Sequence, residues 1–151
     1  MNKPSKPHEL MTFEIAEYVF GIDINDIQEI NCHAVLSRVP VAYDAVAGVI
    51  NLRGEVLTVL ALGRMLGIKS PPPNGERASY VVVKSTSGRV AIAVDKLKDV
   101  ETIPAKDLEH LPSNFRLSNQ HVFRGLVQRQ SGILLVLDSS RTAELGIVQT
   151  V

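Results

Sequence analysis

The 151-residue chain has one cysteine, Cys32, and no tryptophan. A single cysteine excludes an internal disulfide and fits a reducing compartment. Positive and negative side chains balance, with 16 Lys and Arg against 16 Asp and Glu, whereas a nucleic-acid-binding domain usually carries a basic excess. Aromatic residues make up only 5% of the chain, which disfavours base-stacking sites and aromatic grooves for proline-rich peptides.

Long hydrophobic runs are missing as well. No segment approaches the roughly 18 uncharged apolar residues that a membrane-spanning helix needs, and the N-terminus lacks the continuous apolar stretch of a signal peptide. With 45% hydrophobic and 21% charged residues, the composition is typical of a globular domain with a substantial core. We therefore expect a soluble, cytoplasmic protein.

Groups for catalysis or metal binding are scarce. Cys32 and His33 are neighbours, but neighbouring side chains of a strand point to opposite faces, which disfavours a nucleophile–base pair. The four histidines have no i, i+4 pairing and no partner cysteines, which disfavours a zinc site. We expect no catalytic residue, metal or cofactor. Two alternatives stay open: a small enzyme that uses Cys32 or a carboxylate, and a nucleic-acid-binding β-barrel.

The chain does contain many short β-rich segments separated by turn residues. They are 9–16, 18–24, 56–62, 79–85, 89–95 and 132–138. Thr86-Ser87-Gly88 predicts a hairpin, residues 62–67 a short helical turn, and 139–148 a C-terminal helix capped by Ser139 or Ser140. Short strands at this spacing favour a β-barrel or β-sandwich.

Two blocks of the sequence recur in the same order. The aligned pairs are 22–30 with 92–100, at an offset of 70 residues, and 48–64 with 125–141, at an offset of 77. The second pair begins on a shared glycine, Gly48 and Gly125, and ends on a shared arginine, Arg64 and Arg141. Two ordered matches favour an internal duplication.

The duplication predicts two similar β-subdomains, at about 10–68 and 78–145. Residues 69–77 contain three prolines, which favour an extended path, so we expect this segment to link the two subdomains.

Residues 48–68 are mostly apolar, yet Arg53-Gly54-Glu55 lies near their middle. The valines, isoleucines and glycines of this stretch disfavour a single helix. We therefore predict two strands joined by a turn at Gly54, because glycine tolerates positive φ. Arg53 then lies at the turn, where its side chain can reach solvent or a partner.

The alternation of apolar residues in the paired strands predicts which side chains form the core. The expected core residues are Phe13, Ile22, Val49, Leu57, Val59, Val82, Ile92, Val94, Val127 and Leu135.

The order of these segments is similar to that of a known family. FGIDINDIQEI, then Pro40, then GVINLRGEVLTVLALGRMLG, and in the second half GRVAIAVDKLKDVETI and FRGLVQRQSGILLVLD, resemble the CheW-like domain of bacterial chemotaxis. The resemblance covers about residues 10–145, and the N-L-R-G block with its spacing is its specific part. It implies an all-β fold of two five-stranded SH3-like β-barrels packed together, with short helical turns and a C-terminal helix.

The resemblance also implies a function. A protein of this family is a non-catalytic adaptor that couples the cytoplasmic tip of methyl-accepting chemoreceptors to the regulatory domain of a CheA-type histidine kinase. We accordingly expect two protein partners, recruitment to membrane receptor arrays, no direct membrane insertion, no nucleic acid and no cofactor. The alternative is a paralogous scaffold of a pilus-motility or surface-sensing array.

Carried over by position, the resemblance assigns a receptor-binding groove between the two barrels. Ile27 and Glu29 flank this groove, Gly48 lines it, and Arg53 holds its polar edge. Two structural alternatives stay open: Arg53 orders the barrel junction by pairing with Glu29, and Ile27 is a core residue.

The implied kinase contact uses the first barrel near Ile24 and Leu36, and a second, ring-forming contact uses the loop around Phe115. Phe115 lies in the polar stretch PSNFRLSN, where an aromatic residue without periodic apolar neighbours is expected to be exposed.

The chain departs from the family pattern at two positions. The aspartate that ends the first barrel in the family is Ala61 here, whereas the equivalent residue of the second block, Asp138, keeps the acid. Ala47 stands where a basic residue commonly precedes the first glycine. These departures bear on which sensory system the protein serves.

Overall fold

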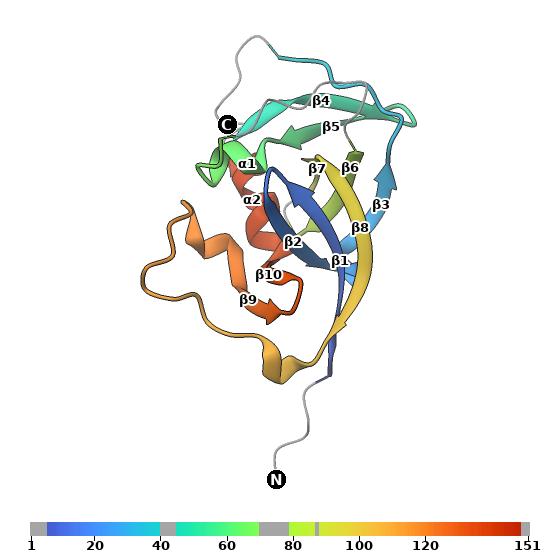
Figure 1. Ribbon diagram of the computed structural model, residues 1–151. Coiled ribbons are helices and arrows are strands. Elements are labelled where there is room, and N and C mark those ends of the chain that lie inside the picture. The colour runs from blue at the N-terminus through green and yellow to red at the C-terminus, as the bar shows by residue number, and fades with distance from the viewer. Residues whose placement is uncertain (1–5, 40–44, 70–78, 87, 149–151) are drawn as a thin grey trace.

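The computed structural model describes residues 6–39, 45–69, 79–86 and 88–148. Within these ranges, ten strands form two five-stranded sheets, here called sheets A and B (Figure 1). The strand order of sheet A is β8 (Lys96–Ile103), β1 (His8–Ile15), β2 (Tyr18–Asp23), β10 (Gly132–Leu137) and β9 (Phe123–Arg129). The order of sheet B is β3 (Ile27–Asn31), β6 (Ser79–Ser85), β7 (Gly88–Val94), β5 (Glu55–Leu60) and β4 (Val46–Leu52). The predicted all-β fold of two five-stranded SH3-like barrels is confirmed.

Neither sheet is built from one half of the chain. After β2, a 3₁₀ turn at Ile24–Asp26 carries the chain from sheet A to β3 of sheet B, and β8 returns to sheet A after β7. The prediction of contiguous subdomains at 10–68 and 78–145 was therefore wrong. Consecutive strands usually pair, but the Asp23 carboxylate accepts a hydrogen bond from the amide of Asn25 at 2.9 Å, and this capped turn redirects the chain. The predicted linker lies outside the described residues except for Lys69.

The repeat itself is visible in the fold. The first pair of blocks covers β2–β3 and β7–β8, and the second covers β4–β5 and β9–β10. The two glycines that begin the second pair also share an environment. A backbone bridge joins Ser37 to Val49 beside Gly48, and an equivalent bridge joins Glu109 to Leu126 beside Gly125.

The C-terminal helix spans the predicted residues but not with the predicted cap. Helix α2 (Ser139–Val148) follows β10 of sheet A yet packs on β5, β6 and β7 of sheet B (Figure 1). Its cap is Asp138, whose carboxylate accepts a hydrogen bond from the amide of Arg141 at 3.0 Å. An aspartate one residue before the helix also suits the helix dipole, so the choice of Ser139 or Ser140 was wrong.

The predicted helical turn is α1 (Leu62–Met65). The residue at its cap position, Ala61, makes no side-chain hydrogen bond to the helix. Ala61 therefore offers its helix no side-chain cap, whereas Asp138, at the equivalent position of the other repeat, caps α2.

Three apolar clusters make up the core. The largest lies between the sheets and joins residues of both, including Phe13, Phe20 and Ile22 of sheet A and Val81, Val83, Val90 and Ile92 of sheet B. A second cluster belongs to sheet B and contains Ile50, Leu52, Leu57, Val59, Tyr80, Val82 and Ala91. A third belongs to sheet A and contains Leu10, Ile103, Val127, Leu134 and Val136. Each barrel therefore has its own apolar interior, and the two barrels share the core between them.

Nine of the ten predicted core residues are buried. The exception is Val49, which is only half-buried. Burial in β4 alternates through Val46, Gly48, Ile50 and Leu52, so Val49 faces the other side. This alternation could not be recognised in the sequence, because Gly48 is buried but has no apolar side chain.

Residues 48–60 form two antiparallel strands, as predicted. Leu52 pairs with Glu55, and the two residues between them both have positive φ, 54° at Arg53 and 84° at Gly54. These signs are those of the type I′ turn that suits the twist of a hairpin. The amide of Gly54 donates to the side-chain oxygen of Asn51 at 2.9 Å. The positive φ of Gly54 was predicted, and that of Arg53 was not.

Replacing Gly54 with valine is expected to lower the free energy of unfolding by about 1–3 kcal/mol. No atom lies within 4 Å of the position of an added Cβ, so the cost is backbone strain at positive φ rather than a clash. Gly54→Asn is the matched control, because asparagine tolerates positive φ. Urea denaturation measures both. Equal midpoints for the valine and asparagine variants would contradict a left-handed Gly54.

Candidate functional site

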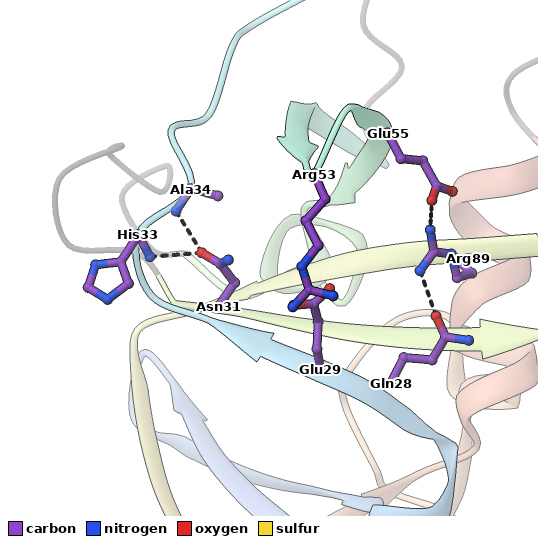
Figure 2. A network of polar contacts seen from close by, with 8 residues as sticks. All are labelled: Gln28, Glu29, Asn31, His33, Ala34, Arg53, Glu55 and Arg89. Atoms are coloured by element: carbon purple, nitrogen blue, oxygen red, sulfur yellow. Dashed lines mark hydrogen bonds and ion pairs between the residues drawn. The ribbon is translucent and has the colours of Figure 1, made fainter.

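A cluster of polar side chains surrounds the β4–β5 turn. The Arg53 guanidinium donates a hydrogen bond from Nη2 to Glu29 Oε2 at 3.2 Å (Figure 2). The side chain of Arg53 is 84% exposed and that of Glu29 is 21% exposed. Glu29 lies on β3 and Arg53 follows β4, and these are the two edge strands of sheet B. The ion pair therefore bridges the edges of the sheet.

A second arginine links β3 to β5, the strand that follows the Arg53-Gly54 turn. Arg89 lies on β7 and donates from Nη1 to Gln28 Oε1 at 2.8 Å, while its Nη2 forms an ion pair with Glu55 (Figure 2). Gln28 precedes Glu29 on β3, and Glu55 follows the Arg53-Gly54 turn. Both sides of the hairpin tip are thus tied to β3, directly through Arg53 and indirectly through Arg89. Sequence reasoning did not identify Arg89.

The pairing of β3 with β6 shifts register at Gln28. Ile27 opposes Val83, whereas Glu29 opposes Val82, so one extra residue lies on β3. Such a bulge re-aims the side chains on either side of it. Ile27 is half-buried against the core between the sheets, and Glu29 points to Arg53 (Figure 2).

Gly48 is buried beneath the segment that precedes β4. The amide of Ser37 donates to the carbonyl of Val49 at 2.8 Å, and the amide of Val49 donates back at 2.8 Å. A Cβ on Gly48 would lie 2.3 Å from the Ser37 carbonyl oxygen. Gly48 is required for this close approach, so any effect on a partner is indirect.

The predicted kinase-contact residues fall in separate places. Ile24 is half-buried in the 3₁₀ turn, which contacts β1 and β6. Leu36 is half-buried against the interior cluster of sheet B. Phe115 lies on the loop that precedes β9 of sheet A.

Phe115 is half-buried rather than exposed, which corrects the expectation from the polar loop. Its ring packs edge-on against Phe123, with ring centroids 5.3 Å apart. Leu111 and Leu117 of the same loop also pack on the core between the sheets, and their presence on both sides of Phe115 was an available signal. Phe115 lines a groove of about 440 Å³ together with Glu17, Tyr18, Val19, Pro112, Asn114, Arg116, Leu117, Leu126, Ile133 and Leu135.

Two further side chains carry chemically reactive groups, Cys32 and Tyr80. Cys32 is exposed, and its Sγ accepts a hydrogen bond from Ser79 Oγ at 3.4 Å. Burial raises the pKa of the Tyr80 phenol, because the phenolate would be desolvated. In the described ranges, no three His, Cys, Asp or Glu side chains gather into a possible metal site. No helix in the same ranges has the length and hydrophobicity to cross a membrane.

The two sheets and their apolar clusters define an all-β domain of two SH3-like barrels, each with its own interior and with a shared core between them. The family model of the CheW-like domain matches residues 9–145. The chain therefore belongs to the CheW-like family.

Individual relatives agree with this assignment. The "Chemotaxis protein CheW" of Thermotoga maritima is 27% identical over 139 residues, which cover 92% of this chain and 89% of the relative. The protein of the same name from Rhizobium meliloti is 32% identical over 104 residues, or 69% and 66% of the two chains. The crystal structure of the scaffolding protein TtCheW from Thermoanaerobacter tengcongensis has the same fold, with a TM-score of 0.79 at 20% identity over 90% of this chain and 92% of that one.

Proposed function

We propose that this protein is a cytoplasmic, non-catalytic adaptor that couples chemoreceptors to a CheA-type histidine kinase in receptor arrays. Family membership over residues 9–145 supports the adaptor class, and relatives that cover most of the chain are named as chemotaxis proteins. The observation that carries the proposal is the exposed guanidinium of Arg53, which a tight turn holds beside Glu29 on the edge of β3. Catalytic residues, metals and cofactors take no part in this function.

The proposed receptor site comprises Ile27, Glu29 and Arg53, and the resemblance assigns Gly48 to it as well, although Gly48 lies beneath the segment at Ser37. An exposed ion pair such as Arg53–Glu29 contributes little to the free energy of folding. Its side chains can therefore bind a partner without loss of stability. A receptor tip is a helical hairpin, and a helix docks an apolar stripe while polar groups set its register. Half-buried Ile27 supplies an apolar contact. The planar fork of Arg53 supplies several directed donors.

Replacing Arg53 with alanine is expected to weaken receptor binding by about 1–3 kcal/mol, the range for a hydrogen bond to a charged group. The melting temperature and kinase binding should stay close to those of the parent, because the side chain is 84% exposed. Titration calorimetry with a soluble receptor-tip fragment from the same organism measures the binding, and thermal melts measure the stability.

Two further variants sharpen this test. Arg53→Lys should restore only part of the affinity, because an ammonium group lacks the guanidinium fork. Arg124→Ala removes an exposed arginine from sheet A and should leave binding unchanged. If Arg53→Ala binds at full strength, or if its binding falls only because the protein unfolds, Arg53 has a structural role alone.

The proposed kinase contacts are Ile24 and Leu36, with Phe115 in a second, ring-forming contact. An aromatic side chain that lines an apolar groove is a frequent anchor at protein interfaces, and Phe115 has this position.

Phe115→Ala is expected to weaken kinase binding and array formation, and also to lower stability by about 1–2 kcal/mol, because the ring packs on Phe123. Phe115→Leu is the matched variant, since it keeps most of the apolar volume in the core. Co-sedimentation of receptor, kinase and adaptor, well below the melting temperature, measures assembly. Full assembly by the alanine variant would remove Phe115 from the kinase contact.

The alternative is a paralogous scaffold in a pilus-motility or surface-sensing array. Ala47 bears on this alternative, because it packs against the interior cluster of sheet B at the position where the resemblance implies a basic residue. A pull-down from native cytoplasm distinguishes the systems by the kinase and receptor tails that it recovers.

A further inference from the structure

The two barrels close their edges in different ways. In sheet A, Arg129 on edge strand β9 forms an ion pair with Glu101 on edge strand β8, with Nη1 2.5 Å from Oε2. Arg129 also donates from Nε to the carbonyl of Gly132 at 3.1 Å. Its side chain is 15% exposed. The side chain of Arg129 therefore bonds within its own barrel and is largely inaccessible to a partner.

In sheet B, two arginines rather than one link the strands through their side chains. Arg89 bonds Gln28 of β3 and Glu55 of β5 from the middle of the sheet, and its side chain is 29% exposed. Arg53 reaches the edge strand from the hairpin tip but stays 84% exposed. At the repeat offset of 70 residues, the position equivalent to Arg89 is Val19 in sheet A. The second arginine is thus a feature of sheet B, the sheet that carries the proposed receptor site.

We infer that Arg89 is a positioning residue for receptor binding: it closes sheet B and holds Glu29 and Arg53 in place, leaving Arg53 available to the partner. This inference rests on the proposed receptor site. Arg89 binds Gln28, the residue at the register shift, and so fixes the direction of the neighbouring Glu29. It also binds Glu55, the residue that follows the Arg53-Gly54 turn, and so fixes the hairpin tip.

Without Arg89, the exposed Arg53–Glu29 pair would be the remaining described side-chain link between the tip and β3. An exposed ion pair holds its two partners weakly. A receptor would then have to order β3 and the hairpin on binding, and this ordering costs affinity. Arg89 thus acts on the receptor through two other residues and need not touch it.

The test compares the intact chain with Arg89→Met, Arg129→Met and Arg53→Ala. Methionine keeps an apolar stem and removes the donors, and Arg129→Met opens the equivalent closure of sheet A. Titration calorimetry with the receptor-tip fragment measures binding at a temperature at which every variant is folded. Amide hydrogen exchange by NMR at Gln28, Glu29 and Gly54 reports the order of the site independently of the receptor.

Arg89→Met should bind the receptor fragment about three- to tenfold more weakly, as expected when one or two side chains must be ordered on binding. Amide exchange should rise at Gln28, Glu29 and Gly54 in this variant only. Arg129→Met should lose comparable stability but keep full receptor affinity. Arg89→Lys should recover part of the affinity, because an ammonium group cannot reproduce the fork that joins two acceptors.

The outcomes separate this inference from the function on which it rests. If Arg53→Ala binds weakly and Arg89→Met binds at full strength, the receptor site stands and the positioning role is overturned. An equal loss with Arg129→Met would assign the effect to general stability and overturn it as well. If the parent binds and neither Arg53→Ala nor Arg89→Met weakens binding, the receptor site lies elsewhere and both ideas fail. If the parent does not bind the fragment, the coupling proposal fails. Unchanged amide exchange at Glu29 in Arg89→Met would overturn the positioning role.

Discussion

Val59→Asp is expected to unfold the protein or to remove most of its stability. Val59 is fully buried in β5, within the interior cluster of sheet B. The described residues of that cluster offer no cation to a carboxylate. An unpaired buried charge costs at least about 3–5 kcal/mol, and a domain of this kind has only about 5–15 kcal/mol in total. Circular dichroism and urea denaturation measure the loss.

The control for Val59→Asp is the same substitution on the same strand. Val56 is the second residue of β5 and is 63% exposed, so Val56→Asp should change stability by less than about 0.5 kcal/mol. A Val59→Asp variant that melts like Val56→Asp would show that the alternation of buried residues in β5 is wrong.

Local features of the fold could be predicted from the sequence. The β4–β5 hairpin follows from β-branched residues on both sides of Arg53-Gly54, and the structure confirms it. The C-terminal helix has its predicted bounds. The duplication was visible because each repeat conserves its own close packing, with Gly48 and Gly125 at the same backbone bridge. The hairpin and the helix depend on residues near one another in the chain, and the duplication shows in two blocks that recur in the same order.

The assignment of strands to sheets could not be predicted in the same way. The Ile24–Asp26 turn sends β3 to the other sheet, and nothing in the pattern of β3 alone distinguishes its partner. The parallel pairing of β2 with β10 and of β5 with β7 joins residues far apart in the chain. Such long-range pairing depends on how both repeats pack together, so contiguous subdomains were the simpler and incorrect choice.

The candidate site shows the same limit. Arg53 could be identified because a charged side chain at a turn inside an apolar segment is unusual. Its pairing with Glu29 was one of the predicted alternatives. Arg89 could not be identified, because its partners Gln28 and Glu55 lie 61 and 34 residues away. An arginine at a strand position otherwise indicates only a solvent-facing side chain.

The two repeats differ in the helix that follows their last strand. Asp138 caps α2, and this helix crosses to cover sheet B. Its counterpart α1 begins after Ala61 without a side-chain cap and ends after one turn. The cap therefore accompanies the longer helix, whose packing on β5, β6 and β7 joins the end of the chain to the sheet that carries Arg53.

Gly48→Ala is expected to lower the free energy of unfolding by about 2–4 kcal/mol and to weaken kinase binding as well. A methyl group at this position would lie 2.3 Å from the Ser37 carbonyl oxygen and 3.0 Å from Leu36 Cδ1. Backbone atoms cannot yield so far without losing the two Ser37–Val49 hydrogen bonds, each worth about 0.5–1.5 kcal/mol, and overpacking adds strain. Leu36, a proposed kinase contact, would move with its segment.

The repeat and helix α2 supply the comparisons for Gly48→Ala. Gly125→Ala should cost a similar amount, because its added methyl would lie 2.2 Å from the Glu109 carbonyl oxygen, but it should leave Leu36 in place and affect kinase binding less. Gly146→Ala meets atoms no closer than 3.4 Å and should be neutral or stabilising, since alanine favours a helix. Urea denaturation and kinase titration of the three variants test this together. If Gly48→Ala is as stable as Gly146→Ala, the segment at Ser37 does not rest on β4, and Gly48 is open to a partner after all.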